Sequence, residues 1–248
     1  MRFLQQKQLA IFVVFVKIKT MRKLRFPSEI AYIVGLAILS LGTCLMEKAN
    51  FGLSMIAAPA YLLSRLLTKT VSSFFTFGRC EIILEIIVVM LLCLIIRKFK
   101  TGYLFSLLAG IFYGLTLDMW IFLFRNIELT TFGIRLIYFL IGQVATAFGI
   151  AVQFKSYLPP SAYDFFVKEA SKHFNVSVPK FKTGFDITFV IISITLSFAI
   201  FGFGHFEGIK LGTVFVALIN GTTIGAAQKV IDSCMSFYDL MNLKGLFD

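Results

Sequence analysis

The feature that most limits the fold of this sequence is a series of apolar runs long enough to cross a lipid bilayer. A helix needs about 20 mostly apolar residues to span the hydrocarbon core, and runs near that length recur along the chain. They predict about six transmembrane helices, over residues 30–46, 81–96, 101–124, 131–154, 185–204 and 211–230. The sequence therefore predicts an all-α membrane protein.

The composition agrees with this interpretation and excludes the soluble classes. Hydrophobic residues make up 58% and charged residues 15% of the 248 residues, and the mean hydropathy is +0.87. A soluble domain of this length has too little interior to bury so much apolar surface. Disordered chains are poor in aromatic residues, which make up 16% of this chain. In a membrane protein the net charge of +11 reports topology rather than a nucleic-acid partner.

Two further stretches are predicted as short helices that do not span. Residues 51–64 are apolar but reach only about 21 Å as a helix, less than the hydrocarbon thickness. Residues 155–184 hold an amphipathic helix whose charges, including Lys168, Glu169 and Lys172, are too costly for lipid. Whether residues 51–64 re-enter the membrane is left open.

Positive charge gives the predicted orientation. If six helices cross, most Lys and Arg residues lie in segments on one side, namely 1–29, 97–100, 155–184 and the tail. The positive-inside rule places that side in the cytoplasm. If residues 51–64 also crossed, the basic residues would be divided almost evenly between the two sides. Six spans with both termini cytoplasmic is therefore the prediction.

The predicted organisation has four parts, and the first and last lie outside the membrane. A basic cytoplasmic segment contains an apolar run, Leu9–Val16, which is too short to span and lacks a signal cleavage site. It is either an interfacial anchor or outside a native chain that starts at Met21. The tail is predicted to be a cytoplasmic amphipathic surface helix. The four parts are 1–29, a first membrane repeat at 30–124, a second at 131–230, and the tail at 231–248.

The two membrane parts resemble each other at one constant offset of 107 residues. The matches are Gly35 with Gly142, Gly42 with Gly149, Ser54 with Ser161, and Gly114 with Gly221. Each repeat holds three predicted crossings and a short helix, and an odd number of crossings inverts the second repeat. Inverted repeats are frequent in secondary transporters, whose sites lie near the bilayer midplane. Duplication without transport is the alternative.

Glycines four residues apart mark predicted packing faces. Gly110 and Gly114 form one such stripe, and Gly221 and Gly225 form another. Small residues at this spacing let helix backbones approach closely in lipid. Both stripes therefore predict close helix contacts.

Three polar residues inside the apolar runs are candidates for a solute or ion site: Asp118, Asn220 and Gln143. Asp118 lies one turn beyond the first glycine stripe, and a carboxylate within a span needs a partner or a role. Arg135 is its nearest candidate partner. Alternatively, Asp118 is hydrated at a helix end, and the two amides only join neighbouring helices. Glu85, near the end of its predicted span, is expected to snorkel or to pair.

The sequence contains no motif for catalysis or cofactor binding. Its four cysteines, Cys44, Cys80, Cys93 and Cys234, form no paired metal spacing, and there are two histidines. Neither a phosphate-binding loop nor a nucleophile elbow is present. We therefore expect no metal, no cofactor and no enzymatic activity.

Residues 28–232 resemble the YczE/YitT-like bacterial multi-pass membrane proteins. The resemblance is closest in the second half, where its motifs are Pro160, Ser161 and Asp164, the Asn-Val-Ser-Val link at 175–178, and Gly208, Gly212, Thr213 and Gly221. The first half matches more loosely, through Gly35, Gly42, Gly52 and Gly114. The resemblance implies a bacterial cell membrane and leaves the substrate unspecified.

These observations favour a transporter or exporter of a small solute. One alternative is a non-catalytic accessory or assembly protein of the membrane, and another is a membrane-embedded substrate-binding subunit of a larger importer. The expected partners are the lipid bilayer, a small solute, and either a second copy or another membrane protein. No nucleic acid is expected.

Overall fold

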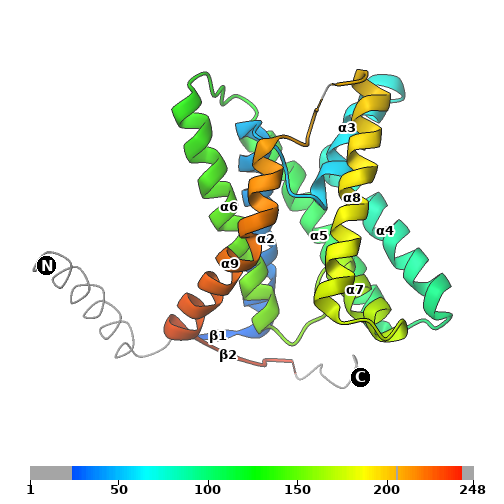
Figure 1. Cartoon of the computed structure of the whole chain (residues 1–248). Helices are drawn as coiled ribbons and strands as arrows, with labels where there is room; N and C mark the ends of the chain where they lie inside the picture. The colour runs from blue at the N-terminus through cyan, green and yellow to red at the C-terminus, as the bar shows by residue number, and fades with distance from the viewer. Residues whose placement is uncertain (1–23, 205, 242–248) are drawn as a thin grey trace, which may run out of the picture.

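The computed structural model describes residues 24–204 and 206–241, which form eight helices and two short strands (Figure 1). The elements are β1 (Leu24–Pro27), α2 (Ser28–Ala49), α3 (Ala57–Thr70), α4 (Phe77–Ile96), α5 (Thr101–Leu123), α6 (Phe132–Lys155), α7 (Ala162–His173), α8 (Val178–Phe201), α9 (Leu211–Cys234) and β2 (Met235–Tyr238). The all-α class predicted from the sequence is confirmed.

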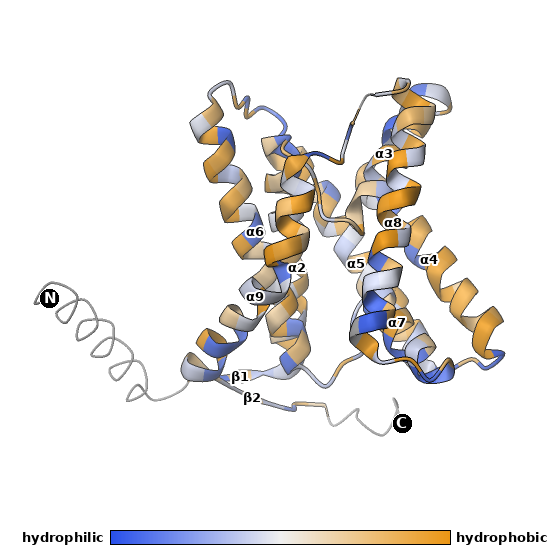
Figure 2. Ribbon diagram, in the orientation of Figure 1, coloured by the Kyte–Doolittle hydropathy of each residue, from blue (hydrophilic) through white to orange (hydrophobic). Residues whose placement is uncertain are grey.

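Five of the described helices are long and apolar enough to cross a membrane, namely α2, α5, α6, α9 and the Lys180–Phe201 part of α8. α4 has 20 residues but carries Arg79, Glu81 and Glu85, so composition alone does not select it. Large apolar side chains face outward along the five helices and along α4. Leu94 of α4 is 72% exposed and Leu218 of α9 is 77% exposed. In Figure 2 hydrophobic residues predominate along the helices, and hydrophilic residues lie largely toward the two ends of the molecule. The chain is therefore a multi-helix membrane protein.

The helices form two groups that lie on either side of α5. α2, α6 and α9 pack together in one group, and α3, α4, α7 and α8 pack in the other (Figure 1). α5 contacts both groups, through α2 on one side and through α4 and α7 on the other. Each group therefore contains helices from both halves of the sequence.

Glycines set the contact between α2 and α6. A Cβ built on Gly42 would lie 2.7 Å from the carbonyl oxygen of Gly142, and one on Gly35 would lie 3.1 Å from that of Gly149. The order of the pairs shows that the helices run antiparallel. Because no side chain separates the backbones, they approach to a distance that other residues would prevent.

The two glycine stripes predicted from the sequence have different surroundings. Gly114 packs against the backbone of Gly78 on α4, and Gly110 packs against the side chain of Glu85. In contrast, a Cβ on Gly221 or Gly225 would meet nothing within 4 Å in the described chain. The close contact expected at Gly221 and Gly225 is absent, because α8 and α9 lie apart whereas their counterparts α4 and α5 pack together (Figure 1).

The tail differs from the surface helix predicted for it. α9 ends at Cys234, and the following residues form β2, which pairs in parallel with β1 so that Leu24 faces Met235. The apolar side chains of Phe26, Met235 and Phe237 pack against a buried cluster at this end. A helix over 235–238 is therefore wrong, because β1 supplies a strand partner that sequence periodicity does not reveal. The apolar run at Leu9–Val16 and the last seven residues lie outside the described residues.

We predict that Gly42→Ala lowers the melting temperature of the detergent-purified protein, whereas Gly221→Ala does not. The added methyl group at Gly42 would meet backbone at 2.7 Å, and overpacking of this kind costs about 1–3 kcal/mol. At Gly221 the space is open and alanine is the better helix former. Equal effects of the two substitutions would contradict the assigned packing.

Candidate functional site

A cavity of about 110 Å³ lies between the two helix groups. Gln143 and Glu85, near the middle of α6 and α4, are among its lining residues, and along α6 the lining continues to Gln153 near the helix end. Apolar side chains form part of its wall, including Leu36, Ile150 and Val216. The polar lining comes from α2, α4, α5, α6, α7, α9 and the segment before α3: Thr43, Ser54, Glu81, Glu85, Tyr113, Gln143, Thr146, Gln153, Ser161, Tyr163, Asp164 and Asn220.

Two carboxyl groups of α4 enter this cavity from successive helical turns. Glu81 is 2% exposed and Glu85 is 3% exposed. The hydroxyl of Tyr163 donates a hydrogen bond of 2.8 Å to Oε2 of Glu81. Oε2 of Glu85 has no hydrogen-bond partner, and its carboxyl group occupies the space left by the missing side chain of Gly110. The first glycine stripe therefore makes room for a buried acid.

Gln143 and Asn220, two of the candidate site residues predicted from the sequence, form a hydrogen bond in the cavity lining. Nε2 of Gln143 donates to Oδ1 of Asn220 at 3.2 Å and to Oγ1 of Thr223 at 3.3 Å. Oε1 of Gln143 has no partner, and neither has Nε2 of Gln153, ten residues farther along α6. Buried polar groups in proteins are nearly always hydrogen-bonded. Three residues with an unpartnered buried polar atom, Glu85, Gln143 and Gln153, therefore line this one cavity.

The lining of the cavity is acidic. No Lys, Arg or His is among the described residues that line it. Asp164 at its edge is paired with Lys182, at 3.1 Å, whereas Glu81 and Glu85 have no ion pair among the described residues. Burial, and then the nearby Glu81, raise the pKa of Tyr163, so this phenol stays protonated and keeps donating to Glu81.

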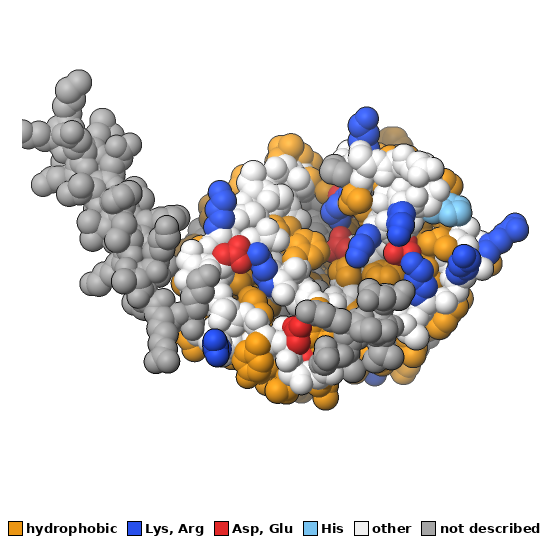
Figure 3. Space-filling model, turned by 90° about the horizontal axis from the view of Figure 1, so that it is seen from below, with side chains coloured by type: hydrophobic (Ala, Val, Ile, Leu, Met, Phe, Trp, Pro, Cys, Tyr) orange, Lys and Arg blue, Asp and Glu red, His pale blue; other side chains and the backbone are white. Residues whose placement is uncertain are grey.

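A larger cleft, of about 760 Å³, connects the cavity with one end of the molecule. Gln153, Asp164 and Asn220 line both spaces. Toward its mouth the cleft is lined by Lys100 and Glu169, which form an ion pair at 2.6 Å. Figure 3 views the molecule from this end, where basic side chains are numerous. A molecule in the cleft can therefore reach the cavity past side chains that belong to both spaces.

At the other end, hydrogen bonds close the path between the helix groups. The segment before α3 is bound to the start of α9: N–H of Leu53 donates to the carbonyl of Gly208 at 2.9 Å, and N–H of Gly212 donates to the carbonyl of Phe51 at 3.0 Å. Nζ of Lys210 donates to Oδ1 of Asn50 at 2.6 Å. The described structure therefore opens toward one end.

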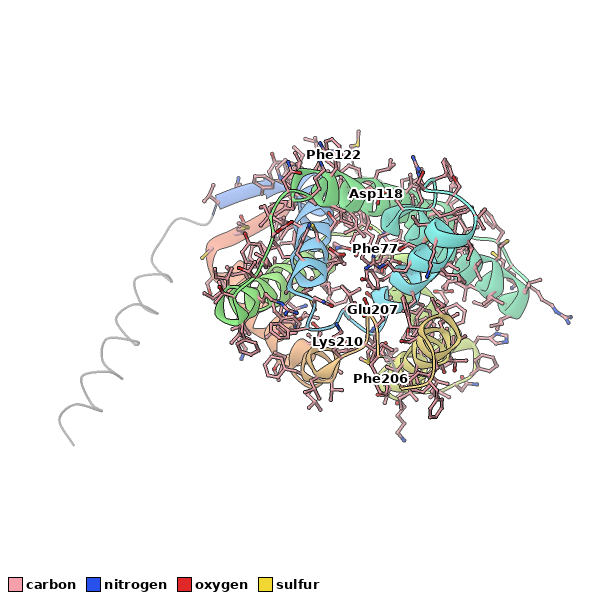
Figure 4. The ribbon with its side chains drawn as sticks, turned by 90° about the horizontal axis from the view of Figure 1, so that it is seen from above. Phe77, Asp118, Phe122, Phe206, Glu207 and Lys210 are labelled. Carbon is pink, nitrogen blue, oxygen red and sulfur yellow. The ribbon has the colours of Figure 1, made fainter. Side chains whose placement is uncertain are left out.

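Asp118 lies outside the cavity, at the closed end. It accepts hydrogen bonds from the hydroxyl of Thr76 and, at 2.8 Å, from N–H of Gly78, and so caps the start of α4. Figure 4 shows it near Phe77, apart from Glu207 and Lys210. Sequence reasoning made Asp118 a candidate for the site because it shares a helix face with Gly110. In the structure Asp118 lies two turns beyond Gly110, toward the end of α5.

Arg135 does not pair with Asp118. Its Nε donates to the carbonyl of Ala49 at 2.8 Å, its Nη2 donates to that of Asn50 at 3.2 Å, and its guanidinium lies over the ring of Phe51. The predicted Asp118–Arg135 pair is wrong because the end of α2, with its free carbonyl groups, lies nearer to Arg135.

Sequence reasoning missed the two acids of α4 and Tyr163. It expected Glu85 to snorkel because the predicted span began at Glu81. α4 begins at Phe77 instead, which moves Glu85 to mid-helix. Two carboxylates four residues apart in an apolar helix were the available signal, because this spacing places both on one face. Ser161, just before α7, makes no side-chain cap, and Asp164 pairs with Lys182.

The described residues hold no group of three or more His, Cys, Asp or Glu side chains placed to bind a metal. The four cysteines are free thiols, and Cys44 and Cys80 are buried.

We predict that Asp118→Ala destabilises the protein by about 1 kcal/mol, as loss of a helix cap does. Because Asp118 and Arg135 share no contact, Asp118→Ala and Arg135→Ala should add to within about 0.5 kcal/mol in thermal unfolding. A double variant more stable than Asp118→Ala alone would show that the two residues form a pair after all.

Comparison with known proteins gives a family. A protein-family model described as a family of unknown function (DUF6198) matches residues 26–229. The uncharacterized protein YyaS of Bacillus subtilis (strain 168) is 32% identical over 122 residues, which are 49% of this chain and 57% of that protein; the chain thus matches little more than half of this relative's length. No solved structure matches. Since the family model covers most of the sequence, the chain belongs to the family of unknown function DUF6198.

Proposed function

We propose that this protein is a membrane transporter of a small solute, which binds in the cavity between the two helix groups. The observation that carries the proposal is the set of three buried, unpartnered polar atoms around that cavity, on Glu85, Gln143 and Gln153. A purely structural interior would satisfy these groups, because each unpaired one costs free energy. The proposal assigns no catalytic residue.

The proposed architecture is six spans in two inverted repeats, with α4 as the sixth span. In this architecture α3 corresponds to α7 and α4 corresponds to α8. The contacts support it because α4 packs on α7, and the corresponding helices α8 and α3 also pack together. The α2–α6 contact is reciprocal in the same way, since Gly35 meets Gly149 and Gly42 meets Gly142. A twofold axis in the membrane plane relates elements in this manner.

The short helices support the same proposal. The segment before α3 is bound to the start of α9 at Leu53. At the equivalent place in the second half, Oγ of Ser106, near the start of α5, donates to the carbonyl of Pro160 just before α7, at 2.8 Å. Ser54, just before α3, and Ser161, just before α7, both line the cavity. In inverted-repeat transporters such short helices commonly end near the substrate.

The proposed orientation places the cleft and both termini on the cytoplasmic side of a bacterial cell membrane. The cleft is lined by Lys100, Lys168 and Lys182, which belong to the basic segments that the positive-inside rule assigns to the cytoplasm. In this orientation the described structure is open to the cytoplasm. The resemblance to YczE/YitT-like proteins fits a bacterial membrane and specifies no substrate.

α9 favours a second candidate function. Gly221 and Gly225 face open space, so a helix of another membrane protein or of a second copy could pack there. An accessory protein, or the membrane-embedded substrate-binding subunit of a larger importer, would use this face. Such a protein would need only one access route to its cavity.

The topology prediction uses single cysteines in a chain whose four natural cysteines are replaced by alanine. Lys172 and Ser72 are exposed at opposite ends of the molecule, whereas Ser171 is 1% exposed and unsuitable for labelling. A membrane-impermeant maleimide should label Ser72→Cys in intact cells, and should label Lys172→Cys only after permeabilisation. Labelling of both positions in intact cells would rule out the inverted arrangement.

The transport prediction uses Asn220→Cys, because Asn220 lines both the cavity and the cleft. A transporter exposes its site to each side in turn, so Asn220→Cys should react with the maleimide in intact cells and also in inverted vesicles. Lys172→Cys is the matched control and should react in inverted vesicles only. If Asn220→Cys reacts from the cytoplasmic side alone, the accessory or subunit function is favoured.

A further inference from the structure

We propose that the central cavity binds a small organic cation that carries N–H donors, such as an ammonium or guanidinium head group. This inference rests on the proposed function, since it assigns a substrate class to the same cavity. Its basis is the carboxyl group of Glu85, which lines the cavity, is 3% exposed and has no ion pair among the described residues, together with the unpartnered Oε1 of Gln143 in the same lining.

All charged side chains among the described lining residues are acidic, and one of them, Asp164, is neutralised by an ion pair. α4 contributes Glu81 and Glu85, α7 contributes Asp164, and Asp164 is compensated by Lys182 of α8 at 3.1 Å. The other helices contribute only uncharged groups to the lining. A buried carboxylate without a partner is strongly unfavourable, so a cationic ligand beside Glu85 stabilises the site and an anion is repelled.

The free polar atoms define the hydrogen bonds of the ligand. Oε1 of Gln143 is an unpartnered acceptor and therefore needs an N–H donor. The carboxyl group of Glu85, whose Oε2 fills the gap at Gly110, has no ion pair among the described residues and supplies the negative charge. Nε2 of Gln153 is a donor, and Gln153 also lines the cleft. The cationic head thus fits between Glu85 and Gln143, and a substituent that bears an acceptor would point toward Gln153 and the cleft.

The size and walls of the cavity favour an organic cation over an inorganic one. A cavity of 150 Å³ accommodates benzene, so 110 Å³ suits a head group of about five non-hydrogen atoms. A bare alkali ion would leave most of this space empty. Tyr113 and Tyr163 add aromatic rings to the lining, and such rings attract organic cations.

Three probes of matched size test the inference by their effect on the melting temperature of the purified protein. Methylguanidinium has charge and N–H donors, methylurea has N–H donors without charge, and tetramethylammonium has charge without N–H donors. We expect a saturable rise with methylguanidinium, because a ligand that binds only the folded state stabilises it. Methylurea, tetramethylammonium and an equal concentration of sodium chloride should give little or no rise. An equal rise with methylurea or with sodium chloride would overturn the proposal, and an equal rise with tetramethylammonium would overturn its hydrogen-bonded part.

Variants of three glutamates test whether methylguanidinium binds in the cavity. Glu85→Gln keeps the shape and removes the charge, so it should weaken methylguanidinium binding about ten- to hundredfold, as expected for a lost hydrogen bond to a charged group. Glu81→Gln should weaken it less, because Glu81 already has Tyr163 as a partner. Glu128→Gln, at an exposed position, is the control and should bind normally. Undiminished binding by Glu85→Gln would overturn the proposal.

A second measurement covers the case in which Glu85→Gln does not fold. Methylguanidinium should slow maleimide labelling of Asn220→Cys in a chain that retains Glu85, and methylurea should not; absence of protection would overturn the inference. Failure of the cation proposal can be distinguished from failure of the transport proposal. Cation binding with one-sided access to Asn220→Cys contradicts transport alone, and two-sided access without cation selectivity contradicts only the substrate class.

Discussion

The close approach of the α2 and α6 backbones is the contact on which the rest of the arrangement depends. Gly35, Gly42, Gly142 and Gly149 remove the side chains that would hold these helices apart. In lipid there is little hydrophobic drive for helices to associate, so van der Waals contact over a close approach supplies much of the stability. The pair forms the centre of one helix group, and it fixes where α5 and α9 can pack.

Glycine has a different role in the other helix group. At Gly110 the missing side chain admits the carboxyl group of Glu85 rather than a second backbone. This packing holds α4 against α5 and brings an acid to the middle of the protein. α8 and α9, in contrast, lie apart, and residues of both line the cleft. The contact between α4 and α5 thus positions the buried acid, and the separation of α8 from α9 leaves the cleft open.

The cavity combines two properties that stability alone would not favour. Its lining contains three acidic residues, of which only Asp164 has an ion pair, and no basic residue among the described lining residues, and three polar atoms of its lining residues lack partners. In a medium of low dielectric constant both properties are costly. Tyr163 offsets part of the cost at Glu81 through its hydrogen bond, whereas nothing in the described chain does so at Glu85. A bound molecule is the simplest source of the missing interactions.

The sequence by itself determined the features that depend on local composition and period. Apolar runs of sufficient length require helices in a membrane, so the helical class and most helix positions could be predicted. The constant offset also identified Gly35, Gly42, Gly142 and Gly149, although not that they meet.

Only the tertiary structure decided which groups share the cavity. Asp118 and Glu85 are both carboxylates in apolar helices, yet one caps α4 and the other faces the cavity, because their depth depends on where each helix begins and on what packs beside it. Gly114 and Gly221 are separated by the offset of 107 residues, but in the described chain Gly114 has a helix packed against it and Gly221 does not. Contacts between segments distant in sequence, such as β1 with β2 or Gln143 with Asn220, leave no periodic signal in either segment. They arise from the packing of whole helices, which no single segment encodes.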